Sequence, residues 1–147
     1  MSELWQLTAT ELAARIASKR VSSTEVVEAH LRRIESVNPR VNAVVKVLGD
    51  RARRDAAEAD RKVAAGEQLG PLHGVPFTIK ENIDAAGCAT TWGVPAYARN
   101  VATKNAVAVD RLLGAGVVLF GKTNVPLFLA DWQSYNAIYG KIGRAHV

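Results

Sequence analysis

The fold is decided by residues 75–80, which read Val-Pro-Phe-Thr-Ile-Lys, a short apolar run that ends on a lysine. The turn-rich segment 70–74 precedes it, and this contrast predicts a strand. A second apolar run, 117–120, predicts another strand. Between them, apolar residues within 105–113 recur at helical spacing, and the glycines of 114–116 end that helix. Strand, helix and strand in this order make a βαβ unit, and uniformly apolar strands are typical of a sheet covered on both faces, so the sequence predicts an α/β fold.

The residues before this unit predict two helices. Thr8-Ala9-Thr10-Glu11 is a capping box, and apolar residues spaced along one helical face follow it. Ser22-Ser23-Thr24-Glu25 repeats the device and opens a longer helix, which we expect Asn38-Pro39 to end because proline cannot continue a helix. His30 falls on the apolar stripe of this second helix, so a packed or hydrogen-bonded histidine is favoured over a metal ligand.

A strand and a third helix come next. Residues 41–48 are rich in β-branched side chains and predict a strand, with Gly49-Asp50 as its exit turn. The Ala, Arg and Glu content of 51–65 favours an exposed helix that Gly66 closes. Basic and acidic residues alternate along this helix, which indicates a solvated face rather than a nucleic-acid-binding surface.

Composition narrows the class of protein. The chain has 147 residues, of which 48% are hydrophobic and 22% charged, with a formal net charge of +5, and these values favour one globular domain. Cys88 is the single cysteine, so no internal disulfide and no thiolate metal cluster is expected, and the three histidines lack ligand-like spacing. The N-terminus lacks a leader pattern and no apolar stretch approaches membrane-spanning length. We therefore expect a cytoplasmic protein with no metal, no membrane partner and no nucleic-acid partner.

Residues 116–123, Gly-Val-Val-Leu-Phe-Gly-Lys-Thr, match the phosphate-binding pattern of nucleotide-binding proteins at every position. Such a loop needs a strand before its first glycine and a flexible turn between its glycines. Here a helix precedes Gly116, and the intervening residues are themselves the predicted strand. A P-loop-like nucleotide binder is therefore the weaker alternative.

Lys80, at the end of the first predicted strand, is the candidate catalytic residue. A structural lysine in this position covers apolar surface with its stem and sends its ammonium to water, Glu81 or Asp84. A catalytic lysine is buried there, because burial disfavours the charged form, lowers the pKa and yields a neutral amine that accepts a proton. The strand alone favours the structural interpretation.

The motifs around Lys80 reverse this preference, because several segments in correct order and spacing resemble the amidase-signature family. These segments are 71–76, 80–84, 90–91, 121–126 and 133–140. The similarity extends from residue 5 to residue 140. Glu81 stands where the family usually has aspartate, and Leu127 where it usually has an acidic residue.

The resemblance implies the N-terminal part of an amidase-type α/β/α fold, with a mixed central sheet covered by helices on both faces. It implies amide hydrolysis through a serine acyl-enzyme, in which Lys80 takes a proton through a bridging serine from the nucleophilic serine, without any cofactor. Both serines lie well downstream in the family, so we expect the 147 residues alone to be inactive.

The implied partner is a small-molecule amide, and a homodimer of the full-length enzyme is the expected assembly. The glutaminase subunit of a tRNA-dependent amidotransferase is the alternative within the family. The closing heptapeptide, 141–147, matches the translation of a common sequencing-library adapter. We therefore expect residues 1–140 to be the N-terminal portion of a single amidase domain and residues 141–147 to be a non-native tail.

Overall fold

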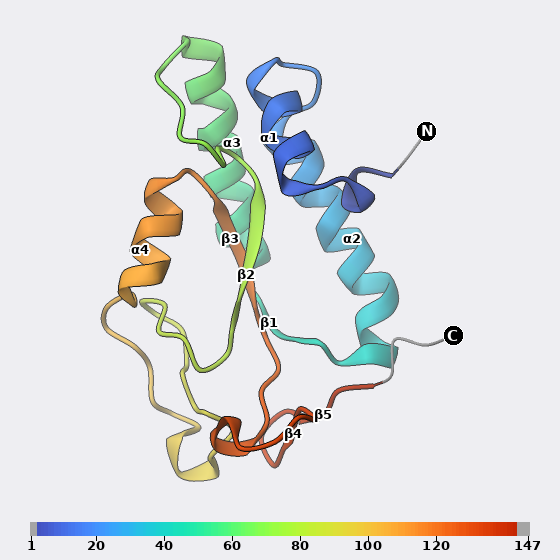
Figure 1. Ribbon diagram of the computed structural model, residues 1–147, viewed down its shortest axis with the longest axis vertical. Helices are drawn as coiled ribbons and strands as arrows, with labels where there is room; N and C mark the ends of the chain where they lie inside the picture. Colours follow the sequence, from blue (N-terminus) through green and yellow to red (C-terminus); the bar gives the residue numbers. More distant parts are fainter. Residues whose placement is uncertain (1–2, 144–147) are drawn as a thin grey trace. The chain divides into compact units, whose positions relative to one another are not determined.

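The computed structural model describes residues 3–143, which form two compact units. Of the described residues, the first unit comprises 3–36, 48–77 and 111–120, and the second comprises 37–47, 78–110 and 121–143. The helices are α1 (Ala9–Ala17), α2 (Ser23–Val41), α3 (Gly49–Ala65) and α4 (Val107–Gly114), with short 3-10 helices at Leu4–Gln6, Pro95–Tyr97 and Leu127–Leu129 (Figure 1). The strands are β1 (Val44–Val47), β2 (Pro76–Lys80), β3 (Val118–Thr123), β4 (Tyr135–Asn136) and β5 (Gly140–Lys141).

Three of these strands form a sheet in the order β1-β3-β2. Strand β1 runs antiparallel to β3, with Val44 opposite Thr123. Strands β2 and β3 run in the same direction, because Val118 N donates to Val75 O at 2.8 Å and Glu81 N donates to Thr123 O at 2.9 Å. The sheet is therefore mixed, and the predicted βαβ unit and α/β class are confirmed.

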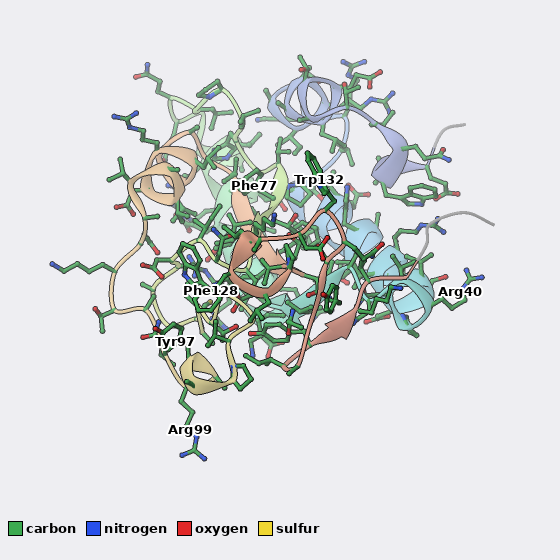
Figure 2. The ribbon with its side chains drawn as sticks, turned by 60° about the horizontal axis from the view of Figure 1, so that its bottom comes forward. Arg40, Phe77, Tyr97, Arg99, Phe128 and Trp132 are labelled. Atoms are coloured by element: carbon green, nitrogen blue, oxygen red, sulfur yellow. The ribbon has the colours of Figure 1, made fainter. Side chains whose placement is uncertain are left out.

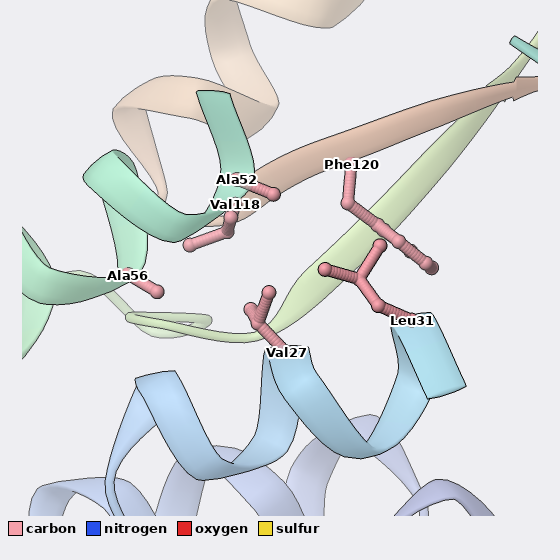
Figure 3. Close-up of a cluster of buried hydrophobic side chains, with 6 residues drawn as sticks. All are labelled: Val27, Leu31, Ala52, Ala56, Val118 and Phe120. Atoms are coloured by element: carbon pink, nitrogen blue, oxygen red, sulfur yellow. The ribbon is translucent and has the colours of Figure 1, made fainter. Parts of the chain in front are cut away.

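The core of the first unit lies where α2 and α3 meet β3 (Figure 3). Its buried members come in pairs from the three elements: Val27 and Leu31, Ala52 and Ala56, Val118 and Phe120. Alanines at the contact allow α3 to approach the sheet closely, since they bury apolar surface without adding bulk. Helix α3 is thus amphipathic: the predicted solvated face is present, and a row of alanines that the prediction of an exposed helix did not include is buried.

Both predicted capping boxes are confirmed. The Thr8 hydroxyl accepts from Glu11 N at 3.2 Å, and the Glu11 carboxylate accepts from Thr8 N at 2.8 Å. Ser22 and Glu25 exchange the same pair of bonds at the start of α2, at 3.0 and 2.8 Å. Each box satisfies backbone N–H groups that have no partner inside the helix.

The predicted end of α2 at Asn38-Pro39 is wrong, because the helix continues through Pro39 to Val41. Asn42 N donates to Asn38 O at 2.7 Å and closes one more turn. The Asn38 side chain then accepts from Ala43 N and from Val44 N, each at 2.9 Å, and so turns the chain into β1. Proline forfeits one hydrogen bond in this last turn, and the Asn38 cap offsets that loss. The strand is correspondingly shorter than predicted.

The remaining local predictions concern His30 and the start of α3. His30 Nδ1 lies 2.8 Å from Val26 O and its ring meets Phe120 edge to face, so the packed histidine is confirmed. Residues Gly49 and Asp50, predicted as a turn, are the first turn of α3. The predicted non-native tail falls in part on 144–147, outside the described residues. Within 3–143, no helix combines the length and apolarity needed to cross a membrane.

Candidate active site

Strand β2 presents Lys80 and its neighbours on alternating faces. Ile79 is 3% exposed and Glu81 is 1% exposed, whereas Lys80 between them is exposed. Glu81 remains in register with β3 through its bond to Thr123 O, so the alternation of a strand continues past Lys80. The side chain of Lys80 therefore projects away from the face into which Glu81 is buried. A neutral catalytic lysine is expected to be buried, but the described residues leave Lys80 exposed.

Glu81 is bound by three donors. Its carboxylate accepts from Thr91 N at 2.7 Å, from Trp92 N at 3.1 Å and from the Tyr139 hydroxyl at 3.0 Å. A buried carboxylate is stable only when donors of this kind replace its lost hydration. Burial raises the pKa of the Tyr139 phenol above its ordinary value, and its bond to Glu81 adds to the effect.

Lys122 is buried from the neighbouring strand, β3, and is 1% exposed. Its ammonium donates to Ala89 O at 2.6 Å and to Thr90 Oγ1 at 3.1 Å. Burial lowers the pKa of the Lys122 ammonium, and the negative charge of Glu81 acts in the opposite direction. Residues 89–92 are thus held by an ammonium from one strand and a carboxylate from the end of the next.

The backbone of this segment is strained at Trp92, which has φ +56 although it is not glycine. Trp92 O accepts from Phe128 N at 2.9 Å, which ties the segment to the 3-10 helix at Leu127–Leu129. Phe128 is itself at φ +51. Strained residues persist only where their surroundings fix them, and they gather at functional sites.

A pair of buried asparagines fixes Tyr139. Asn136 Nδ2 donates to Asn124 Oδ1 at 3.1 Å and to Val125 O at 2.8 Å. On its other side, Asn136 Oδ1 accepts from Tyr139 N at 2.8 Å. This network sets the position from which the Tyr139 hydroxyl reaches Glu81.

A cavity of about 640 Å³ lies beside Trp92. Its lining residues are Trp92, Ala96, Tyr97, Arg99, Asn100 and Phe128. Figure 2 shows Tyr97 and Phe128 near one another, with Arg99 extending outward. Three of the six lining residues are aromatic, which suits an apolar group, and Arg99 adds a guanidinium to the lining.

The phosphate-binding geometry is absent from residues 116–123, because β3 occupies 118–123 and the Lys122 ammonium is bonded within the protein. The nucleotide alternative is therefore excluded by the local structure. Ser22 is a helix cap as predicted, and the Ser23 hydroxyl donates to Gly74 O at 2.7 Å. Neither serine has an open role as a nucleophile.

Lys80 can be proposed from the sequence, whereas the buried charges of Glu81 and Lys122 cannot. In the sequence, Lys122 stands out in the false phosphate-binding match and in the family-like segment 121–126. Glu81 stands out as a departure from the resembled family and as a possible partner of Lys80. One feature of the sequence does point to Lys122, namely its position within an apolar strand. A lysine there either lies at the exposed end of the strand or is buried with specific hydrogen-bond partners. The partners of Glu81 lie far along the chain, at 91–92 and 139, and no local pattern predicts them.

The chain is similar to known proteins along most of its length. A family model described as Amidase matches residues 25–144. An acylamidase of Rhodococcus erythropolis is 52% identical over 134 residues, which cover 91% of this chain and 28% of that protein. A glutamyl-tRNA(Gln) amidotransferase subunit of Acidothermus cellulolyticus is 41% identical over 140 residues, covering 95% of this chain and 28% of that protein.

The fold has a matching crystal structure as well. A bacterial aryl acylamidase of the amidase signature enzymes superposes with a TM-score of 0.88 at 30% identity, over 92% of this chain and 29% of that chain. The chain thus spans less than a third of the length of each of these relatives.

Proposed function

Because this chain belongs to the amidase family, whose model matches residues 25–144, we propose that it is part of an enzyme that hydrolyses carboxamides through a serine acyl-enzyme. Lys80 is the general base of this reaction. The observation that carries the proposal is the end of β2, where Lys80 projects from a strand whose next residue, Glu81, is buried and fixed by three hydrogen bonds. A base held on a rigid strand end can act repeatedly in one geometry.

The chemistry assigned to Lys80 is proton transfer. In its neutral form the amine takes a proton through a bridging serine, and the nucleophilic serine then attacks the amide carbonyl. The C–N bond of the substrate then breaks as Lys80 returns the proton through the bridging serine to the departing amine, which leaves the acyl group on the nucleophilic serine. Water hydrolyses this ester, releases the carboxylic acid and restores the serine hydroxyl. No metal or organic cofactor takes part in this scheme.

Lys80 is exposed in the described part of the chain, so the proposed reaction requires further groups to bury it. The described residues leave the Lys80 side chain in water, whereas a general-base amine has to be shielded from solvent. Groups beyond the described residues must therefore cover Lys80 in the active enzyme and supply both serines. On this proposal the 147 residues alone are inactive, and residues 1–140 form the N-terminal portion of one amidase domain.

A glutaminase role is the second candidate, because the amidotransferase subunit from Acidothermus cellulolyticus is 41% identical to the chain. The acylamidase is more similar, at 52% identity, and this favours an amide-hydrolysing role for the chain.

The test is to read the complete gene past the codon for Gly140 and to assay its purified product. We expect a Gly-Ser-rich segment with two serines downstream, and hydrolysis of an aryl carboxamide by the protein alone. Hydrolysis of glutamine only, and only with partner subunits, would favour the second candidate. A gene without such serines, or a product inert toward every carboxamide, contradicts the proposal.

A further inference from the structure

Two buried side chains of opposite charge grip one short segment of backbone. Glu81 accepts from the backbone N–H groups of Thr91 and Trp92, and Lys122 donates to the carbonyl of Ala89. Both side chains are 1% exposed. They come from adjacent strands, since Glu81 directly follows β2 and Lys122 lies in β3.

We propose that Glu81 and Lys122 are positioning residues that hold Lys80 on the catalytic face of β2, an inference that rests on the function proposed for Lys80. They act through residues 89–92, whose hydrogen bonds to Glu81 and Lys122 fix the end of β2. Neither residue touches the reacting atoms.

The alternation of strand side chains carries the argument for Glu81. Lys80 and Glu81 are consecutive, so a rotation that released Glu81 from its pocket would also turn Lys80 away from its face. Glu81 N is bonded to Thr123 O, which fixes the backbone, and the three donors on the carboxylate fix the side chain. The direction of Lys80 is thereby determined by a neighbour that is fully bonded.

The role of Lys122 follows from the other end of the same segment. Its ammonium binds Ala89 O and Thr90 Oγ1 and draws residues 89–90 against β3. A buried charge without its bonded partners is strongly unfavourable, so Glu81 and Lys122 each restrict where the segment can lie. If the hydrogen bonds of either Glu81 or Lys122 are lost, Thr91 and Trp92 are no longer held in place. The backbone donors that fix the Glu81 carboxylate then move as well.

The experiment uses the full-length enzyme and three substitutions at Glu81 and Lys122. Glu81→Gln keeps the size of the side chain but turns an amide NH₂ toward at least one of the donors, so a backbone bond is lost. Glu81→Asp keeps the charge and is the conservative variant. Lys122→Met keeps the length of the side chain and removes the donor, and it serves as the second variant if Glu81→Gln does not fold. Glu67→Gln, on an exposed residue, is the control.

The measured quantities are kcat and KM for an aryl carboxamide, with kcat expressed per active site titrated by a serine-reactive fluorophosphonate. This normalisation removes any effect of misfolded enzyme. We expect Glu81→Gln and Lys122→Met each to lower kcat about 10- to 100-fold, the effect of displacing a catalytic group by about 1 Å, with little change in KM. Glu81→Asp recovers most of the loss, and Glu67→Gln matches the wild type.

Each outcome has one meaning. A normal kcat per titrated site in both Glu81→Gln and Lys122→Met overturns the inference and leaves these residues with a structural role only. Full activity in Lys80→Met overturns the proposed function, and the inference with it. Loss of activity in Lys80→Met together with normal kcat in the other variants overturns the inference alone.

Discussion

At the scale of single residues, Tyr139 offers a titration that reports the packing around Glu81. Burial holds the pKa of its phenol above the ordinary value of 10.0. A raised pKa means that the folded state keeps the proton longer than the unfolded state, so this stabilisation is complete below pH 10 and is lost as the pH rises through the folded-state pKa. We predict a phenol that ionises late in an absorbance titration, with the step removed in Tyr139→Phe. A titration in which Tyr139→Phe leaves the last step unchanged contradicts the packing.

Gly93 provides a second prediction at this scale, with a matched control. Its φ is +70, and an added Cβ would lie 2.8 Å from the Cβ of Asn136. Gly87 has φ +79 but nothing within 4 Å of an added Cβ. Gly87→Ala carries only the backbone penalty of about 1–2 kcal/mol, whereas Gly93→Ala adds a steric cost of about 1–3 kcal/mol. Urea unfolding should rank Gly93→Ala as clearly the less stable, and equal midpoints would show that Asn136 moves aside without cost.

At the scale of elements, the helix starts were predictable because their chemistry is local. Thr8 and Glu11 are three residues apart, and the bonds between them need nothing from the rest of the chain. The end of α2 was not predictable in the same way. Pro39 indicates an end, but Asn38 bonds to Ala43 and Val44 and stabilises one further turn. Such competition between a breaker and a cap is decided by geometry that the sequence pattern does not contain.

The cap of α1 gives the prediction at this scale. Thr8→Ala removes the acceptor for Glu11 N and should lower the free energy of unfolding by about 1 kcal/mol. Thr10→Ala is the matched control, because Thr10 is an exposed threonine inside the same helix and alanine has the higher helix propensity. Chemical denaturation followed by circular dichroism measures both. A Thr8→Ala protein as stable as Thr10→Ala would mean that water caps α1 as well as threonine does.

At the scale of the whole molecule, the sequence predicted the α/β class and the family, because apolar runs and ordered motifs extend along the chain. The site was predicted only in part. Lys80 could be proposed from the sequence because it ends a strand within a motif, and its catalytic role stays a prediction. The burial and bonding of Glu81 and Lys122 depend on distant segments. Hydrophobic periodicity shows that a position is buried, but it does not show which polar partners a buried charge meets.

Several large apolar side chains are exposed on the described part of the molecule. In the described part of the chain, Trp132 is fully exposed and Phe128 is 55% exposed, although both are aromatic. Single exposed aromatic side chains are common on protein surfaces, so hydrophobicity alone does not predict the burial of these two residues.

The central claim is that Lys80 is the base of an amide hydrolase, and the most direct measurement is the single-turnover acylation rate of the full-length enzyme with Lys80→Met. Lys46→Met, at an exposed lysine of β1, is the matched control. The account predicts that Lys80→Met slows acylation by about 10²- to 10⁴-fold, the contribution of a general base, while Lys46→Met acylates at the wild-type rate. Equal acylation rates in the two variants would contradict it.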